Sequence, residues 1–321
     1  MPEAPPRLLA GFDAGQTHTT CRLAVLDATG TWRVLSEGQG SGVSHLAAAG
    51  GDSRFAAALQ SSLRAALAAA PLDANTPLAA AGIGASGIDA RSALQQQGTA
   101  LAAQSLQLSP ERAVVVGDER TALAGAFSGG AGILVISGTG CIAAGSDGQG
   151  KIQRCGGWGW LLDGAGSAMD LGRDGLALSV QMADGRMADT PLRTALWQAL
   201  GADSAQAVKA AVVAPDFGAA GFARLAPVLD QLALGGERHA QAVIARSAEA
   251  LAVMAESVAR QLQLSAPAVC GVGGALLHLQ ALQQAFCTAL RQRLPQARLQ
   301  DPAGDACSGA LSLAAAALMQ R

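Results

Sequence analysis

The chain has no tyrosine, few lysines and no cluster of basic residues, and its 321 residues carry a net charge of −2. Proteins that bind nucleic acid usually show a clustered basic patch, so the composition argues against a nucleic-acid partner. Half of the residues are apolar, which is enough for a sizeable core. The length predicts roughly two domains of about 150 residues each.

The chain also lacks a C-x-x-C pair, a signal-peptide pattern and a long apolar run. Its six cysteines are scattered, and three lie in apolar runs, so we expect reduced core residues in a cytosolic protein. The first seven residues are Pro-rich, with no apolar segment of the signal-peptide type after them. The longest uncharged stretch, about 121–146, is broken by glycines, whereas a membrane span needs about 20 predominantly apolar residues. We therefore expect a cytoplasmic protein without membrane contact.

Apolar runs and turn residues predict alternating strands and helices in the first half of the chain. The expected strands are 8–12, 19–26, 31–36, 78–83 and 112–116, and the expected helices are 53–70 and 92–106. This alternation indicates an α/β domain with parallel strand pairs.

A strand–turn–strand–turn–strand layout opens the chain and returns over residues 132–155. The remainder is predicted to be mostly helical, with helices at 167–183, 191–200, 204–213, 222–234, 237–264, 277–294 and 304–319, and one strand at 268–272. The repeated layout indicates two similar lobes.

An acidic turn follows the first expected strand. Asp13 comes directly after the apolar run, Gly15 permits a sharp turn, and Gln16 and Thr17 complete the tip. A carboxylate can hold hydrated Mg²⁺, and backbone N–H and hydroxyl donors suit phosphate. The alternative is an ordinary polar hairpin, because Asp and Gly favour turns.

A second carboxylate, Asp118, follows the strand expected at 112–116 and precedes a helix. Ligands of α/β sheets bind outside the carboxyl ends of strands, where Asp118 can accept a proton from a substrate hydroxyl. The alternative is that Asp118 only caps the helix.

Three glycine-rich segments lie in the second half. Ser137-Gly138-Thr139-Gly140 has a phosphate-binding composition, although the chain has no G-x-x-x-x-G-K-[ST] pattern. Gly271-Val272-Gly273-Gly274 lets a flat ligand such as a nucleobase lie on the backbone. A hairpin turn and a glycine-rich helix start are the respective alternatives. In Gly156-Gly157-Trp158-Gly159-Trp160 the tryptophans suit core packing or a sugar face, and we expect core packing.

In this order the motifs resemble the actin–hexokinase–Hsp70 superfamily of ATP-binding proteins and, within it, the BadF/BadG/BcrA/BcrD ATPase family, which includes N-acetylglucosamine kinases. The resemblance covers nearly the whole chain. It implies an α/β protein with two similar lobes of the actin-like ATPase (ribonuclease H-like) fold and an ATP cleft between them. The lobes would be 1–117, completed by a C-terminal helix at about 304–321, and 118–303.

The resemblance also implies roles for individual residues. Asp118 would be the catalytic base and Asp13 the acid beside Mg²⁺. The nucleotide would be bound by Gly15, Gln16, Thr17, Ser137, Gly138, Thr139, Gly140, Gly273 and Gly274. The substrate would contact Ser86, Gly87, Asp118, Gly157, Trp158 and Asp163. The segments 84–87 and 305–310 resemble the two connecting segments of the superfamily.

The chain departs from the family pattern in two places. It reads Asp163-Gly164-Ala165-Gly166-Ser167 where the family typically has Gly-Asp-Glu-Gly-Ser. It also carries Gly42-Val43-Ser44-His45 where sugar kinases of the family often have an asparagine that touches the sugar. Both departures concern the sugar and leave the ATP motifs intact.

The implied function is ATP-dependent phosphorylation of an amino sugar, N-acetylglucosamine or glucosamine, at the 6-hydroxyl by a homodimer. One alternative is an ATPase that activates an enzyme of the 2-hydroxyacyl-CoA dehydratase type, although no cysteine here has the context of a cluster ligand. The other is a sugar or nucleotide sensor without catalysis, for which the altered loop at Asp163 is the only support.

Overall fold

The computed structural model describes residues 7–70, 72 and 76–319. The chain forms two compact units: unit 1 comprises residues 1–130 and 302–321, and unit 2 comprises residues 131–301. From the sequence we placed the first boundary after residue 117. The structure places it after Gly130, because helix α3 (Asp118–Ala126) packs against α12 (Ala306–Met319), which belongs to unit 1.

Unit 1 is built on a five-stranded mixed sheet in the order β3-β2-β1-β4-β5. The strands are β1 (Arg7–Ala14), β2 (His18–Leu26), β3 (Trp32–Ser41), β4 (Leu78–Ala85) and β5 (Ala113–Gly117). The first three form an antiparallel meander, whereas β4 pairs in parallel with β1 and β5. The expected combination of hairpins and parallel pairs is confirmed.

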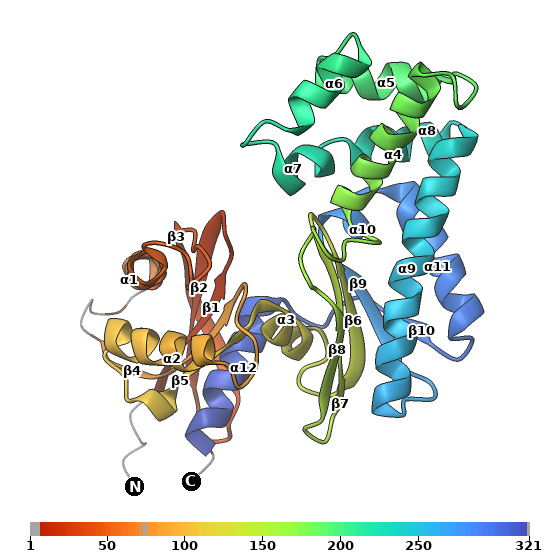
Figure 1. The fold of residues 1–321 in the computed structure, drawn as a ribbon. Helices are drawn as coiled ribbons and strands as arrows, with labels where there is room; N and C mark the ends of the chain where they lie inside the picture. Colours follow the sequence, from red (N-terminus) through yellow and green to blue (C-terminus); the bar gives the residue numbers. More distant parts are fainter. Residues whose placement is uncertain (1–6, 71, 73–75, 320–321) are drawn as a thin grey trace, which may run out of the picture. The chain divides into compact units, whose positions relative to one another are not determined.

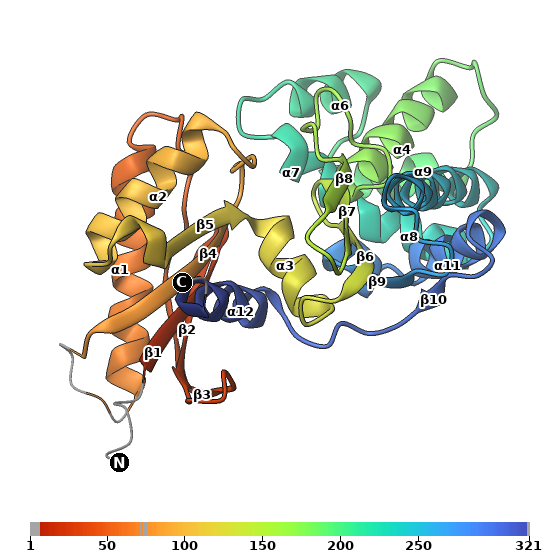
Figure 2. The ribbon, with the colours of Figure 1, turned by 90° about the horizontal axis from the view of Figure 1, so that it is seen from below.

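Helices cover both faces of this sheet (Figures 1 and 2). One face carries α1 (Gly51–Ala69) and α2 (Ala93–Leu106), with a short 3-10 helix (Pro110–Arg112) before β5. The other face carries α3 and α12. Glycines let α12 approach closely, because a Cβ on Gly11 would lie 2.6 Å from the Cys307 oxygen and one on Gly82 would lie 2.8 Å from the Ala310 carbonyl carbon.

Unit 2 repeats the topology of unit 1. Its sheet has the order β10-β9-β6-β7-β8, with β6 (Ala131–Ser137), β7 (Cys141–Asp147), β8 (Ile152–Gly156), β9 (Ala268–Val272) and β10 (Arg298–Leu299). Strands β6, β7 and β8 form an antiparallel meander, and β9 pairs in parallel with β6 and β10. The two sheets therefore share one strand order, as the repeated layout in the sequence indicated.

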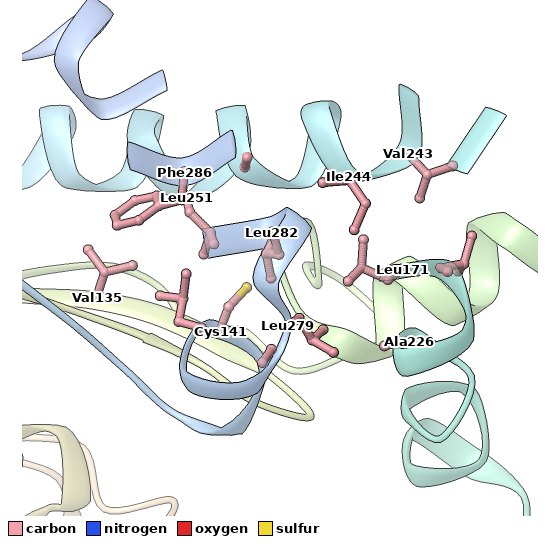
Figure 3. Close-up of a cluster of buried hydrophobic side chains, with 14 of the residues drawn as sticks. Val135, Cys141, Leu171, Ala226, Val243, Ile244, Leu251, Leu279, Leu282 and Phe286 are labelled. Carbon is pink, nitrogen blue, oxygen red and sulfur yellow. The ribbon is translucent and has the colours of Figure 1, made fainter. Parts of the chain in front are cut away.

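Eight helices are described in unit 2: α4 (Ala168–Ala183), α5 (Pro191–Leu200), α6 (Ala205–Val212), α7 (Gly218–Ala223), α8 (Ala226–Leu234), α9 (Arg238–Leu262), α10 (Gly274–His278) and α11 (Gln280–Arg293). Helices α9 and α11 run beside the sheet, and α4 to α8 gather beyond one end of it (Figure 1). Figure 3 shows the core that joins these parts: Val135 of β6 and Leu251 of α9 belong to one cluster with Leu171, Leu282 and Phe286.

Two helices expected as single elements are broken. The span 222–234 divides into α7 and α8, and Pro227, which lacks an N–H, lies in the first turn of α8. The span 277–294 divides at Leu279, whose backbone is extended (φ −97°, ψ 100°). The carboxylate of Asp230 accepts a hydrogen bond from the Leu282 N–H (3.1 Å) and so satisfies the first turn of α11.

All six cysteines are free thiols, and Cys21, Cys141, Cys270 and Cys307 are buried. Among residues 7–70, 72 and 76–319, no helix combines the length and the apolar character that a membrane crossing requires.

The close contact of α12 with the sheet predicts that Gly82→Ala lowers the free energy of unfolding. The added methyl meets backbone atoms, which cannot rotate away, so a cost of about 1–3 kcal/mol is expected. Chemical denaturation measures it. Gly98→Ala is the matched control, because its methyl meets only side-chain carbons at 3.2 Å or more. Equal losses in the two variants would contradict this account.

Candidate functional site

The carboxyl ends of three neighbouring strands in unit 1 bring the predicted acids to one edge of the sheet. Asp13 of β1 is in register with Gly84 of β4, and Ala85 of β4 is in register with Gly117 of β5, which Asp118 follows directly. Because neighbouring strands lie about 4.8 Å apart, only β4 separates the strands that end at Asp13 and Asp118. The predicted substrate residues Ser86 and Gly87 follow β4 at the same edge.

Burial raises the pKa of both carboxyl groups. The negative charges of Asp118 and Asp305 raise the pKa of Asp13 further. Asp118 Oδ1 accepts a hydrogen bond from the Glu119 N–H (2.9 Å), which opposes the effect of burial. Asp118 is the first residue of α3 and Gly117 is its N-cap, which makes no side-chain capping bond, so the alternative that Asp118 is only a cap is not confirmed.

The hairpin tip is held by backbone bonds and leaves its side chains outside. The Gly15 N–H donates to the His18 oxygen (3.1 Å), and the Val43 N–H donates to the Gly15 oxygen (2.9 Å). Gln16 and Thr17 are exposed. Two of the three predicted nucleotide residues of this tip therefore face solvent, and Gly15 is half-buried.

Thr20, to which the sequence patterns assign no role, lies beside Asp13. Thr20 is the register partner of Asp13, so the two side chains lie on the same face of the sheet. Thr19 points to the opposite face, is fully buried, and its hydroxyl has no hydrogen-bond partner in the described residues. Side chains alternate between the two faces of a strand. Following this alternation from Asp13 across the hairpin into β2 places Thr20 on the same face, and this signal could have identified it.

An ion pair fixes the start of α12 beside this edge. Both terminal nitrogens of Arg22 on β2 donate to Asp305 (2.6 and 2.7 Å), and Arg22 also pairs with Glu37. Asp305 Oδ1 accepts from the Ser308 N–H (2.9 Å). Burial alone would raise the pKa of Asp305, but the Arg22 and Ser308 hydrogen bonds outweigh it and lower this pKa to about 2.

His45 packs against the predicted substrate residue Gly87. Gly87 has a φ of +79°, and a Cβ on it would lie 2.5 Å from His45 Cδ2 and 2.7 Å from Nε2. The Ala47 N–H donates to His45 Nδ1 (3.2 Å), which places the proton of the neutral ring on Nε2. The departure from the family pattern at Ser44 and His45 therefore lies next to the end of β4.

In unit 2 the two predicted nucleotide motifs are adjacent. Gly273 has a φ of +90°, and a Cβ on it would lie 2.8 Å from the Ser137 carbonyl carbon and 3.0 Å from the Ser137 nitrogen. The Cβ position of Gly138 is 3.9 Å from the Gly274 nitrogen, and that of Gly140 has no atom of the described residues within 4 Å. Backbone without side chains therefore lines the carboxyl ends of β6 and β9, which suits close approach of a ligand.

The Ser137 hydroxyl forms a hydrogen bond within the protein. It is fully buried and donates to the Gly166 oxygen (2.6 Å), so it supports the altered loop 163–167. The Ala168 N–H donates to the Gly138 oxygen (2.8 Å) and ties the hairpin to the start of α4. Thr139 and Gly140 are exposed.

The tryptophan loop is exposed, so the expectation of core packing is wrong. Trp158 is 63% and Trp160 38% exposed, and the Arg154 guanidinium lies 5.3 Å from the centre of the Trp158 ring. Positive φ values at Gly156 and Gly157 shape the loop. The predicted substrate residue Asp163 closes it, through a bond from its N–H to the Gly159 oxygen (2.9 Å).

The donor set of Asp13 fits magnesium. Within the described residues no three His, Cys, Asp or Glu side chains are grouped to hold a metal ion. Mg²⁺ is usually held by one or two carboxylates together with waters and substrate phosphates. A single carboxylate next to the hydroxyl-bearing Thr20 is compatible with that mode.

The fold defines a class of protein. A glucokinase of the ROK family from Streptomyces griseus, solved with glucose and AMPPNP, shares it with a TM-score of 0.57 at 17% identity, over 97% of this chain and 99% of that chain. A candidate N-acetylglucosamine kinase from Porphyromonas gingivalis shares it with a TM-score of 0.66 at 18% identity, over 96% and 98%. The chain thus has the α/β fold of two similar units found in sugar kinases.

The particular family follows from the sequence. The model of the BadF/BadG/BcrA/BcrD ATPase family matches residues 10–314, and the chain belongs to this family, which confirms the resemblance. A candidate N-acetylglucosamine kinase from Chromobacterium violaceum is 30% identical with a TM-score of 0.75, over 96% of this chain and 99% of that chain.

A curated relative was also found. The N-acetylmuramic acid/N-acetylglucosamine kinase of Clostridium acetobutylicum is 26% identical over 203 residues, which is 63% of this chain. The match spans 66% of that relative's length.

The lowered pKa of Asp305 predicts a pH-dependent effect of Asp305→Asn. Because the folded pKa of about 2 lies below the usual value of about 3.9, the pair stabilises the fold above about pH 4, and this contribution disappears as the pH falls toward 2. The variant should lose about 1 kcal/mol or less at pH 7, since the carboxylate is half exposed.

Chemical denaturation between pH 7 and pH 3 measures this difference. Arg22→Gln removes the other partner and should reproduce the loss. Asp52→Asn, which changes an exposed acid in the first turn of α1, is the control. A difference that stays constant as the pH falls would contradict the assignment.

Proposed function

We propose that this protein is an ATP-dependent kinase that phosphorylates an amino sugar, N-acetylglucosamine or glucosamine, at the 6-hydroxyl. The observation that carries the proposal is the half-buried carboxylate of Asp118, which directly follows β5 and lies one strand away from Asp13. Membership of the ATPase family supports the use of ATP. The names of the relatives from Chromobacterium and Clostridium support an amino sugar.

Asp118 acts as the base in this proposal. Its carboxylate accepts the proton of the sugar hydroxyl as the hydroxyl oxygen bonds to the γ-phosphorus, and ADP leaves with the electrons of the broken P–O bond. A base works best when its pKa is near the operating pH, and burial moves the pKa of Asp118 in that direction. Phosphoryl transfer otherwise depends on positioning and charge stabilisation.

Asp13 would hold Mg²⁺, which neutralises charge on the phosphates when bound. In unit 1 we assign phosphate contacts to Gly15, Gln16 and Thr17, and the N–H groups of Gln16 and Thr17 would be the donors, because the Gly15 N–H is bonded to the His18 oxygen. In unit 2 we assign phosphate contacts to the backbone of Ser137, Gly138 and Gly140 and to Thr139, and adenosine contacts to Gly273 and Gly274. The exposure of Thr139 and Gly140 and the proximity of Gly138 to Gly274 support this assignment.

The sugar would contact Ser86 and Gly87 at the end of β4, and Gly157, Trp158 and Asp163 in the tryptophan loop. The exposed ring of Trp158 offers an apolar face suited to a sugar. N-acetylmuramic acid is a second candidate substrate, because the relative from Clostridium is named for it. The buried positions of four cysteines disfavour the dehydratase-activator alternative, which needs accessible cluster ligands.

We also propose a cytoplasmic homodimer, on the likeness to the family. Size-exclusion chromatography with light scattering reports the mass, and a monomer at assay concentration would reject the dimer without affecting the kinase proposal.

Asp118→Asn is expected to lower kcat by about 10² or more, while ATP still binds. ADP release measured over N-acetylglucosamine, glucosamine, N-acetylmuramic acid and glucose gives kcat and the preferred sugar. ³¹P NMR of the product identifies the phosphorylated hydroxyl. Asp52→Asn, which changes an exposed acid in the first turn of α1, is the control and should keep wild-type activity. A near-wild-type rate of Asp118→Asn would contradict the assignment of Asp118 as the base.

Gly273→Ala is expected to weaken ATP binding at least tenfold, because its methyl meets the backbone of Ser137. Calorimetric titration with a non-hydrolysable ATP analogue measures the affinity. Gly236→Ala is a matched control: Gly236 has nearly the same φ (+87°), but none of the residues that the structure describes has an atom within 4 Å of its Cβ position. Equal affinities in the two variants would show that this junction does not contribute to the nucleotide site.

A further inference from the structure

Thr121 of α3 lies between two glycines of unit 1. A Cβ on Gly84 would lie 2.9 Å from Thr121 Cγ2, 3.0 Å from Thr121 Cβ, and closer still to Oγ1. On its other side, a Cβ on Gly309 of α12 would lie 2.9 Å from the Thr121 carbonyl carbon and closer still to its oxygen. Thr121 is fully buried. The side chain therefore rests on the backbone of β4, and its peptide group rests on the backbone of α12.

The place of this contact matters because both acids of the proposed site adjoin it. Gly84, on which Thr121 rests, is the register partner of Asp13. The Thr121 hydroxyl donates to the carbonyl oxygen of Asp118, one helical turn earlier (3.0 Å). One side chain thus touches the strand beside Asp13 and the backbone of Asp118.

The contact between the Thr121 side chain and Gly84 leaves no room for an added atom. Protein interiors are packed as densely as organic crystals, so a single added methylene is felt by the neighbours. A methyl group on Gly84 overlaps Thr121, and α12 prevents α3 from moving away freely, since Gly309 holds the Thr121 carbonyl. The height of α3 above the sheet is therefore set by the size of the side chain at residue 121.

We propose that Thr121 is a positioning residue that acts as a spacer, fixing the carboxylate of Asp118 relative to that of Asp13 by its contact with Gly84. The proposal rests on the role of Asp118 as the base. A base must lie within about 2.6–3.2 Å of the proton it accepts, and a displacement of about 1 Å can cost about 10² in rate. The spacer thus determines kcat, whereas the residues assigned to the nucleotide and the sugar stay in place.

A double-mutant cycle tests the spacer. Gly84→Ala should lower kcat by about 10- to 100-fold, with the KM for ATP and sugar changed by less than about threefold. Thr121→Ala removes Oγ1 and Cγ2 and leaves only the Cβ, at 3.0 Å from the new methyl. The combination Gly84→Ala with Thr121→Ala should therefore recover at least about tenfold in kcat relative to Gly84→Ala alone, which is the non-additivity expected of residues in contact.

Three controls separate positioning from folding and chemistry. Gly98→Ala adds a methyl to the same unit away from the acids and should keep wild-type kcat. Thermal denaturation of each variant shows how much of any loss comes from unfolding. Thr121→Val keeps the branched shape without the hydroxyl and should retain more activity than Thr121→Ala, a comparison that remains informative where Gly84→Ala does not fold.

The outcomes are distinguishable. A double variant no faster than Gly84→Ala, or a Thr121→Val slower than Thr121→Ala, would overturn the spacer. Losses that appear in KM rather than kcat would overturn it as well. A wild-type protein with no sugar-dependent ADP release would reject the proposed function, whereas an active wild type without recovery in the double variant would reject the spacer alone.

Discussion

The close packing of helices on bare backbone is the constraint on which unit 1 depends. Helix α12 lies against β1 at Gly11 and against β4 at Gly82, and α3 lies against β4 at Gly84. At each of these glycines an added side chain would overlap backbone atoms or a buried side chain of the helix. The carboxyl ends of β1 and β5 are thereby held at one edge, and the charge of Asp118 raises the pKa of Asp13 in this partly desolvated region.

In the proposed function the two units use one topology for different chemistry. In unit 1 the edge carries carboxylates, which suit a metal ion and proton transfer. In unit 2 the corresponding hairpin carries no acid at its tip, and the approach of Gly273 to Ser137 leaves exposed backbone next to it. A sheet with three antiparallel strands and two parallel partners can therefore serve either purpose, according to the residues at the ends of its strands.

Most of the strands and helices could be predicted from the sequence, because the periodicity that marks a strand or a helix is local. The acids at positions 13 and 118 were identified since each ends an apolar run. Contacts across the fold were not accessible in this way. Arg22 and Asp305 meet only after the sheet and α12 have packed, and the Ser137 hydroxyl turns inward because Gly166 offers a carbonyl. The exposure of Trp158 was mispredicted, because composition does not show which side of a loop faces the core.

The order of the chain has a consequence for biosynthesis. About 180 residues separate α3 from α12, and at the usual rate of 5–20 residues per second their synthesis takes about 10–40 s. During that time the face of β1 and β4 that α12 will cover, including the buried Leu9 and Ala80, lacks its partner, whereas unit 2 is contiguous and can fold as it emerges. Unit 1 is thus begun first and completed last, and its unfinished sheet is the part of the nascent chain that needs protection from aggregation.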